Sequence, residues 1–382
     1  MWYLEADTLF LLLVTSGIMI LISGLTRLFF KKDLAPKVLI LANIAVIGII
    51  SYELLLWSLG YIIITFLLIK HLTHRKRCRK FLFVFYCLLC TVPFFYGRMH
   101  EFIPQLPVFI VFIGIAYHML KAIDALYFVY YTEMDIPFLT YANYILFFPT
   151  FTAGPIFRYR DWLRVYQNPQ KLTFDGFVGY VKRFILGMFK KMVVLWFVST
   201  VFSHILNMEL TWYWSLAIIV LSYITVYLDL SGYSDIAIAT GSAMGFTVPE
   251  NFRKPLSAAS FTLFWRNWHI TLSDWVREHI FVILNGKKLG RIASAMVGFM
   301  TMFVMEMWHG FTLPYIIGGV YNGLCLGLEN LFGLTSVDKR KTNKVVFVLR
   351  CLLVNFLFAV NTLLFTVTTD EFWRIIQGFT NL

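Results

Sequence analysis

Two histidines, each directly after a tryptophan, are the residues of this chain best suited to chemistry. They are His269, in the run Phe264–His269, and His309, in the run Met307–Gly310, and both lie in strongly apolar sequence. A titratable side chain at membrane depth is costly, so it usually faces an internal cavity and has a function. An imidazole accepts and releases a proton near neutral pH, which acyl transfer to a hydroxyl requires. The pattern therefore indicates a membrane enzyme.

Polar and aromatic residues near the two histidines could support the reaction. In a helix, Glu306 lies three residues before His309 on the same face and could contact it. A carboxylate beside an imidazole fixes its tautomer and raises its basicity; a pair that only packs helices is the alternative. Helix-breaking glycines and prolines between 241 and 255 predict a broken segment that walls an internal funnel. The supporting or funnel-lining residues predicted here are Glu306, Trp308, Arg266, Trp268, Asn251 and Ser273.

The composition places the chain in a membrane. Of its 382 residues 59% are hydrophobic and 14% charged, whereas a soluble protein carries about a quarter charged residues. Apolar runs approach the roughly 20 residues that a spanning helix needs, and ten-residue strand alternation is absent. We expect an all-α polytopic membrane protein of the plasma membrane, with about 9–12 spanning helices and some re-entrant segments. One integral-membrane domain is expected, with N-terminal helices in 1–104, a catalytic core in 105–333 and a C-terminal helix in 334–382.

The net charge of +12 reflects topology and is not a nucleic-acid signal. Basic residues gather in the breaks between apolar runs, most densely in 70–80, where the positive-inside rule expects cytoplasmic loops. A site for an anionic lipid or a partner is the alternative for this cluster. No cleavable signal peptide is evident, and basic residues after the first apolar run predict an extracytoplasmic N-terminus. The orientation of the C-terminus is left open.

Other classes of site lack their motifs in this sequence. The five cysteines form no metal-binding set with nearby histidines, so we expect no metal site. Motifs for nucleotide binding, for a zinc protease and for a serine hydrolase elbow are absent. A segment at 158–175 predicts an amphipathic helix at the membrane interface, and His118, Lys121 and Asp124 predict a buried polar cluster.

Five segments together resemble the membrane-bound O-acyltransferase family, in the order that this family has them. They are Phe148–Ile156, Asp229–Asp235, Pro249–Pro255, Phe264–Ser273 and Trp308–Gly310. The resemblance covers roughly residues 105–330 and implies a ring of helices around a central funnel. It also implies that His309 is the catalytic histidine and that His269 is the second motif residue, as in the branch that modifies bacterial polymers.

Two subgroups of that branch compete. One transfers D-alanyl groups to teichoic acids, and the other acetylates exopolysaccharides or cell-wall polymers. The chain length, the basic early loop and Phe148–Ile156 favour D-alanyl transfer, whereas Gly232–Asp235 and Pro249–Phe252 favour acetylation. The chain also departs from the family, with Glu306 where a small residue is common and no histidine in Tyr321–Gly323, where one is often found. The sequence prediction is D-alanyl transfer, with acetylation as the alternative.

The resemblance implies partners rather than a bound cofactor. The donor is expected to be a phosphopantetheinyl thioester on a cytoplasmic acyl carrier protein, or acetyl-CoA in the alternative. An extracytoplasmic acyltransferase partner and a polymer acceptor are expected on the other side. An acidic carrier suits a basic face, and the predicted docking residues are Lys287, Lys288 and Arg291. The rival class is a transporter or channel in which the histidines relay protons.

Overall fold

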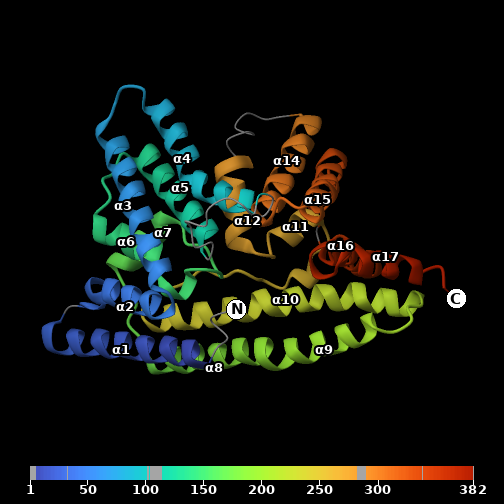
Figure 1. Ribbon diagram of the computed structural model, residues 1–382, viewed down its shortest axis with the longest axis horizontal. Helices are drawn as coiled ribbons and strands as arrows, with labels where there is room; N and C mark the ends of the chain where they lie inside the picture. The colour runs from blue at the N-terminus through green and yellow to red at the C-terminus, as the bar shows by residue number, and fades with distance from the viewer. Residues whose placement is uncertain are drawn as a thin grey trace. The chain divides into compact units, whose positions relative to one another are not determined.

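The computed structural model describes residues 6–31, 33–100, 103, 114–281, 290–337 and 339–381. Every regular element in these ranges is a helix, which confirms the all-α prediction (Figure 1). The chain divides into two compact units. The first unit comprises Met1–Ile185 and Ser234–Pro249, and the second comprises Leu186–Tyr233 and Glu250–Leu382. The predicted single membrane domain, with its boundaries after residues 104 and 333, stays a prediction.

The chain is a multi-pass membrane protein. Seven helices of the described residues are long and apolar enough to cross a membrane, fewer than the 9–12 predicted. The difference arises because some apolar runs fold as short helices, and because α5 and α15 carry polar residues or glycines along their length. The seven candidate spans are Thr8–Phe30, Tyr52–His74, Arg79–Met99, Phe174–Leu206, Trp212–Ala243, Arg291–His309 and Lys344–Thr366.

The first unit contains four long helices and several short ones. Its elements are α1 (Ala6–Phe30), α2 (Ala35–Ile50), α3 (Tyr52–His74), α4 (Arg79–His100), α5 (Ile115–Thr132), α6 (Phe138–Leu146), η2 (Phe148–Thr150), α7 (Tyr159–Gln167), most of α8 (Phe174–Met188) and the part of α10 (Trp212–Ala243) from Ser234 onward. The amphipathic segment predicted at 158–175 folds as α7 and the first two residues of α8, and in α7 Tyr159 and Trp162 are buried and Arg160 is exposed. Two cations near the basic 70–80 cluster are paired, Lys70 with Asp135 and Arg79 with Glu133.

A buried lysine bonds the end of α6 and the η2 turn in the first unit. His118, Lys121 and Asp124 are all buried on α5, as predicted. The Lys121 ammonium donates to the backbone carbonyls of Tyr144 (3.1 Å), Ile145 (3.3 Å) and Thr150 (3.4 Å), where α6 ends and η2 begins. Carbonyls at a helix end lack intrahelical partners, so this cation stabilises the turn between α6 and η2.

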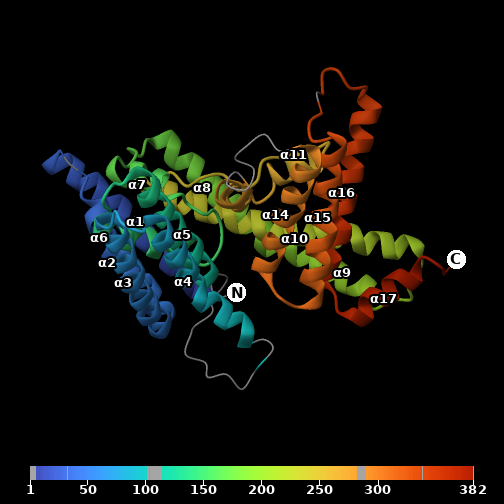
Figure 2. The same ribbon diagram turned by 90° about the horizontal axis from the view of Figure 1, so that it is seen from above.

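The second unit contains the segment with both conspicuous histidines. Its elements are η3 (Phe189–Val194), α9 (Leu195–Leu206), α10 (Trp212–Ala243, as far as Tyr233), η4 (Pro255–Ser257), α11 (Phe261–Trp265), α12 (Ile270–Val276), η5 (Arg277–Phe281), α14 (Arg291–His309), α15 (Leu313–Phe332), α16 (Lys344–Thr366) and α17 (Thr369–Gly378). The helices α14, α15 and α16 lie side by side (Figure 2). This group forms one wall of the candidate site.

A glycine stripe brings α14 and α15 into close contact. Gly319, Gly323 and Gly327 recur every four residues on one face of α15 and are buried. A Cβ at Gly323 would lie 2.7 Å from the Phe299 ring and 3.0 Å from the Phe299 carbonyl oxygen of α14. Small residues at this spacing let helix backbones approach closely in membranes. The stripe therefore fixes the register between the two helices.

Replacing Gly323 with alanine should loosen this hairpin. The added methyl has no free space, so we expect a loss of roughly 1–3 kcal/mol in stability and a lower melting temperature in detergent. The matched control is Gly60→Ala in α3, because a Cβ there meets nothing within 4 Å. Equal melting temperatures for the two variants would contradict this account of the α14–α15 contact.

Candidate active site

A cavity of about 330 Å³ in the second unit is lined by both histidines. Its walls come from α10, the segment 265–272, α14, the start of α15, and α16. The sequence places His269 and His309 forty residues apart, and the fold brings them to the same internal space. Their catalytic role stays a prediction. The polar and titratable lining residues are Thr225, Asp229, His269, Glu306, His309, Tyr315, Asn361 and Thr362.

His269 is buried at the N-cap of α12 with an unusual backbone. Its φ of 45° lies in the left-handed region, which is strained for a residue with a side chain. Asn251 compensates, since its carbonyl accepts from Ile270 N (2.9 Å) and its Oδ1 from the Thr271 hydroxyl (2.9 Å). A further backbone bond joins Arg253 N to the carbonyl of residue 267 at 2.9 Å. The extended segment 250–253 thus holds the turn that presents His269.

The His269 ring is neutral in this environment. Burial lowers its pKa from the usual value to about 4, because the charged form loses hydration. Its Nδ1 is buried without a hydrogen-bond partner among the described residues. A neutral imidazole carries one N–H donor and one acceptor. The ring can therefore donate to a substrate oxygen in the cavity, whereas at neutral pH it carries no positive charge.

His309 occupies a different setting, at the last residue of α14. Its side chain is exposed, and its ring meets the Trp308 ring edge-on with centroids 4.8 Å apart. Gly310 ends the helix, and a Cβ there would lie 2.2 Å from an atom of the Tyr315 ring. Only glycine lets Tyr315 fold against this helix end, where it joins His309 in the cavity lining. A solvent-accessible imidazole beside a substrate-sized space is suited to act as a base.

Glu306 connects three helices at the cavity. It is buried, and its Oε1 accepts from Asn322 Nδ2 of α15 (2.6 Å) and from Asn361 Nδ2 of α16 (3.5 Å). A buried carboxylate is tolerated when hydrogen bonds replace its hydration. The sequence predicts contact between Glu306 and His309; the structure places both in the cavity lining and directs this oxygen to the two amides. Their coupling stays a prediction.

A lysine that the sequence analysis missed supports Asp229, a further carboxylate of the cavity. The fully buried Lys191 donates to Asp229 Oδ1 at 2.6 Å. Lys191 lies in η3, a π-helical turn within a long apolar helix, and such turns are frequent at functional sites. A lysine inside the apolar run 189–194 was the signal available in the sequence. Asn361 was also missed, because nothing near it in the chain marks it.

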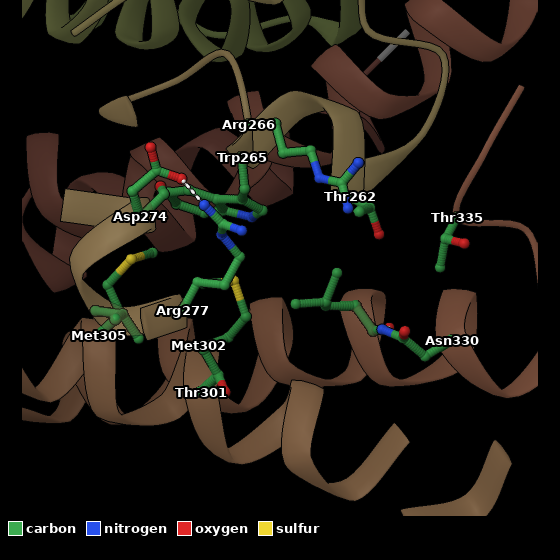
Figure 3. Close-up of a pocket in the computed structure, with 13 residues that line it drawn as sticks. Thr262, Trp265, Arg266, Asp274, Arg277, Thr301, Met302, Met305, Asn330 and Thr335 are labelled. Carbon is green, nitrogen blue, oxygen red and sulfur yellow. Dashed lines mark hydrogen bonds and ion pairs between the residues drawn. The ribbon is translucent and has the colours of Figure 1, made fainter. Parts of the chain in front are cut away.

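The other predicted supporting residues fall in different places. Trp268 lines the histidine cavity and packs on the Phe358 ring, with centroids 4.8 Å apart. Arg266 and Ser273 instead line a neighbouring cavity of about 190 Å³ (Figure 3). Asn251 accepts hydrogen bonds from the two residues that follow His269, and the Trp308 ring contacts the His309 ring. Arg266, predicted as a supporting residue, thus lines a different cavity from the two histidines.

The predicted carrier-docking residues are only partly described. Arg291 is exposed at the first residue of α14, whereas Lys287 and Lys288 lie outside the described residues. Among the residues that the structure places, no group of three or more His, Cys, Asp or Glu side chains could hold a metal ion.

Comparison with known proteins decides the family. Residues 81–366 match the membrane-bound O-acyltransferase family. The chain belongs to this family. Because the match runs from α4 to the end of α16, it includes every element that lines the histidine cavity.

Curated members of the family modify several envelope polymers. The chain is 33% identical over 247 residues to a probable alginate O-acetylase of Pseudomonas fluorescens, covering 63% of this chain and 49% of that protein. It is 30% identical to a peptidoglycan O-acetyltransferase of Helicobacter pylori, covering 51% and 38%. It is 28% identical to a teichoic acid D-alanyltransferase of Bacillus subtilis, covering 69% and 71%. The chain spans about half the length of the alginate O-acetylases that it matches. The identities to the two O-acetylating proteins are higher than the identity to the D-alanyltransferase, so they support the alternative, acetylation, better than D-alanyl transfer.

The role of Asn251 can be separated from general stability. Asn251→Leu removes the acceptor of the Thr271 hydroxyl and should release the His269 turn, lowering kcat roughly tenfold. Asn251→Asp keeps an acceptor oxygen and should restore most of the rate. Asn267→Leu is the matched control, since that amide donates only to Leu263 O one turn away. Rates that are equally low for the leucine and aspartate variants would remove this positioning role.

Glu306 can be tested by removing its charge alone. Glu306→Gln keeps an acceptor for Asn322, but it loses the ionisable carboxyl group, whose ionised form favours a positively charged imidazole nearby. If His309 must be neutral to act, the variant should reach its full rate at a lower pH, with little change in KM. Glu371→Gln is the control, because that carboxylate caps the start of α17 outside the cavity lining. A pH–rate profile identical to that of the unaltered enzyme would leave Glu306 only a packing role.

Proposed function

We propose that this chain is an O-acyltransferase that moves an acetyl group from a thioester to a hydroxyl of a bacterial cell-envelope polymer or of a partner protein. The observation that carries the proposal is the single cavity that His269 and His309 line in a chain of this family. The identities to alginate and peptidoglycan O-acetylating relatives support acetyl as the acyl group.

The two histidines divide the reaction between them. His309 removes the proton of the acceptor hydroxyl, and the oxygen attacks the thioester carbonyl. The neutral His269 donates its N–H to the oxyanion that forms on that carbonyl. The carbon–sulfur bond then breaks, an ester bond has formed, and the proton on His309 passes to the departing thiolate. Proton, acyl group and charge are conserved, and no metal or oxidant is required.

Donor and acceptor enter as partners of the chain. The donor is an acetyl thioester of coenzyme A or of a phosphopantetheinyl carrier protein, and the docking residue that the structure describes is Arg291, exposed at the start of α14. The acceptor is a polymer, reached directly or through an extracytoplasmic acyltransferase partner. A cavity of about 330 Å³ has room for an acyl thioester end and one hydroxyl-bearing group. Holding both together supplies much of the rate by proximity.

D-alanyl transfer to teichoic acid is the second candidate function. The observation that favours it is the coverage of the Bacillus subtilis match, about 70% of both chains. Its donor would carry an ammonium group, which the carboxylates of Asp229 and Glu306 could accommodate. Mass spectrometry of the modified polymer separates acetyl from alanyl.

The rival class, a transporter or channel, is tested by the same assay, because a transporter would consume no thioester.

Replacing His309 with alanine should abolish acyl transfer. The variant loses the group that accepts the hydroxyl proton, and general-base catalysis typically contributes 10²–10⁴-fold. The assay is thioester consumption by purified protein, with polymer modification in a complemented deletion strain. His279→Ala is the control, because that buried histidine stacks on Trp275 outside the cavity lining. Near-normal turnover by the His309 variant at equal protein level would overturn the proposed mechanism.

A further inference from the structure

A second cavity adjoins the histidine cavity within the same unit. It measures about 190 Å³ and lies between the segment 262–277 and the helices α14 and α15 (Figure 3). Trp265 and Met305 line both cavities, which therefore meet at these two side chains. The polar groups that line the second cavity include Thr262, Arg266, Asp274, Arg277, Thr301 and Asn330.

The second cavity has more positive charge than its carboxylate can balance. Arg277 is paired with Asp274 through a bond of 2.7 Å. The exposed Arg266 side chain has no hydrogen bond or ion pair with any side chain that the structure describes. Glu329 lies in the same region, but its carboxylate accepts from Phe261 N, Thr262 N and the Thr262 hydroxyl. One guanidinium is thus left to bind an anion.

The two cavities follow each other along α14. The second cavity meets Thr301, Met302 and Met305, and the histidine cavity meets Met305, Glu306 and His309. At about 1.5 Å per residue, the eight residues from Thr301 to His309 cover about 12 Å. An extended phosphopantetheine arm spans about 20 Å, at under 1.5 Å per bond. A thioester near His309 would therefore place the phosphate of its arm at the level of the second cavity or beyond it.

The basic end of α14 lies on the same side as the second cavity. Arg291 begins this helix and is exposed, and the exposed residues Lys339, Arg340 and Lys341 follow α15 before α16 begins. Basic residues at the ends of spanning helices mark the cytoplasmic face. A cytoplasmic donor would then meet the second cavity first and the histidines after it.

We propose that the Arg266 cavity is the subsite for the phosphate of the thioester donor. The proposal rests on the proposed function, because it assigns one part of that donor. A guanidinium binds phosphate oxygens through two parallel N–H donors, which makes arginine the side chain suited to this task. The phosphate is the one next to the pantetheine arm, which coenzyme A and a phosphopantetheinyl carrier protein share.

The test compares donors that differ in phosphate alone. Purified full-length protein in phosphatidylcholine nanodiscs is assayed with acetyl-pantetheine, acetyl-4′-phosphopantetheine and acetyl-CoA. Arg266→Gln should raise KM roughly 10- to 100-fold for the two phosphorylated donors and leave it nearly unchanged for acetyl-pantetheine. The matched control is Arg277→Gln, in the same cavity but paired with Asp274. It should shift all three donors alike and only slightly.

Three outcomes would overturn the assignment. If Arg266→Gln raises KM equally for all three donors, the guanidinium does not read a phosphate. If it weakens only the acceptor, the cavity binds an acidic polymer carboxylate instead. If adding phosphatidylglycerol to the nanodiscs abolishes the advantage of phosphorylated donors in the unaltered protein, a lipid phosphate occupies the cavity.

A binding measurement keeps this proposal separate from the proposed function. Calorimetric titration with 4′-phosphopantetheine and with pantetheine requires no turnover. Tighter binding of the phosphorylated compound, lost in Arg266→Gln, supports the subsite even if no thioester is consumed. Turnover without any such difference in affinity sinks the subsite and leaves the acyltransferase proposal intact.

Discussion

The candidate site depends on a buried turn whose backbone polar groups must find partners inside the protein. Lipid offers no hydrogen bonds, so irregular backbone in a membrane protein survives only where protein or a wet cavity satisfies it. Here Asn251 holds the start of α12, and the Glu329 carboxylate accepts from the first two amides of α11. The turn between these helices is therefore fixed at both ends. Its rigidity allows His269 to keep a left-handed backbone that an isolated chain would abandon.

The helix α14 converts close packing into site geometry. Glycines of α15 bring the two backbones together, which places Asn322 within hydrogen-bond distance of Glu306. The same contact fixes the position of His309, the last residue of α14, relative to α15. Met305, one position before Glu306, lines both cavities. A single face of α14 therefore positions His309, the buried Glu306 and the side chain at which the two cavities meet. A change in the register of this hairpin would alter all three together.

The sequence predicted the helical membrane fold and a cavity shared by the two histidines, because titratable residues in apolar runs are rare and costly. It could not predict the partners of Glu306, since Asn322 and Asn361 lie 16 and 55 residues away. Nor could it show that Trp265 would line both cavities while its neighbour Arg266 lines only the second. That difference depends on where α11 ends. The sequence also could not decide between D-alanyl and acetyl transfer. The motifs specify the fold that both subgroups share, whereas a few side chains in the site select the acyl group.

The environments of the two histidines suit opposite charges in the transition state. His309 becomes positive when it takes the hydroxyl proton, and it lies at the C-terminus of α14, where the helix dipole favours a cation. The carboxyl groups of Glu306 and Asp229 line the same cavity. His269 meets the developing oxyanion as a neutral, rigid donor. Since its Nδ1 is buried without a partner, the proton is better placed on Nε2, because an orphaned buried N–H is rarer than an orphaned acceptor. Opposite charges can then develop in one cavity, each beside the group that stabilises it.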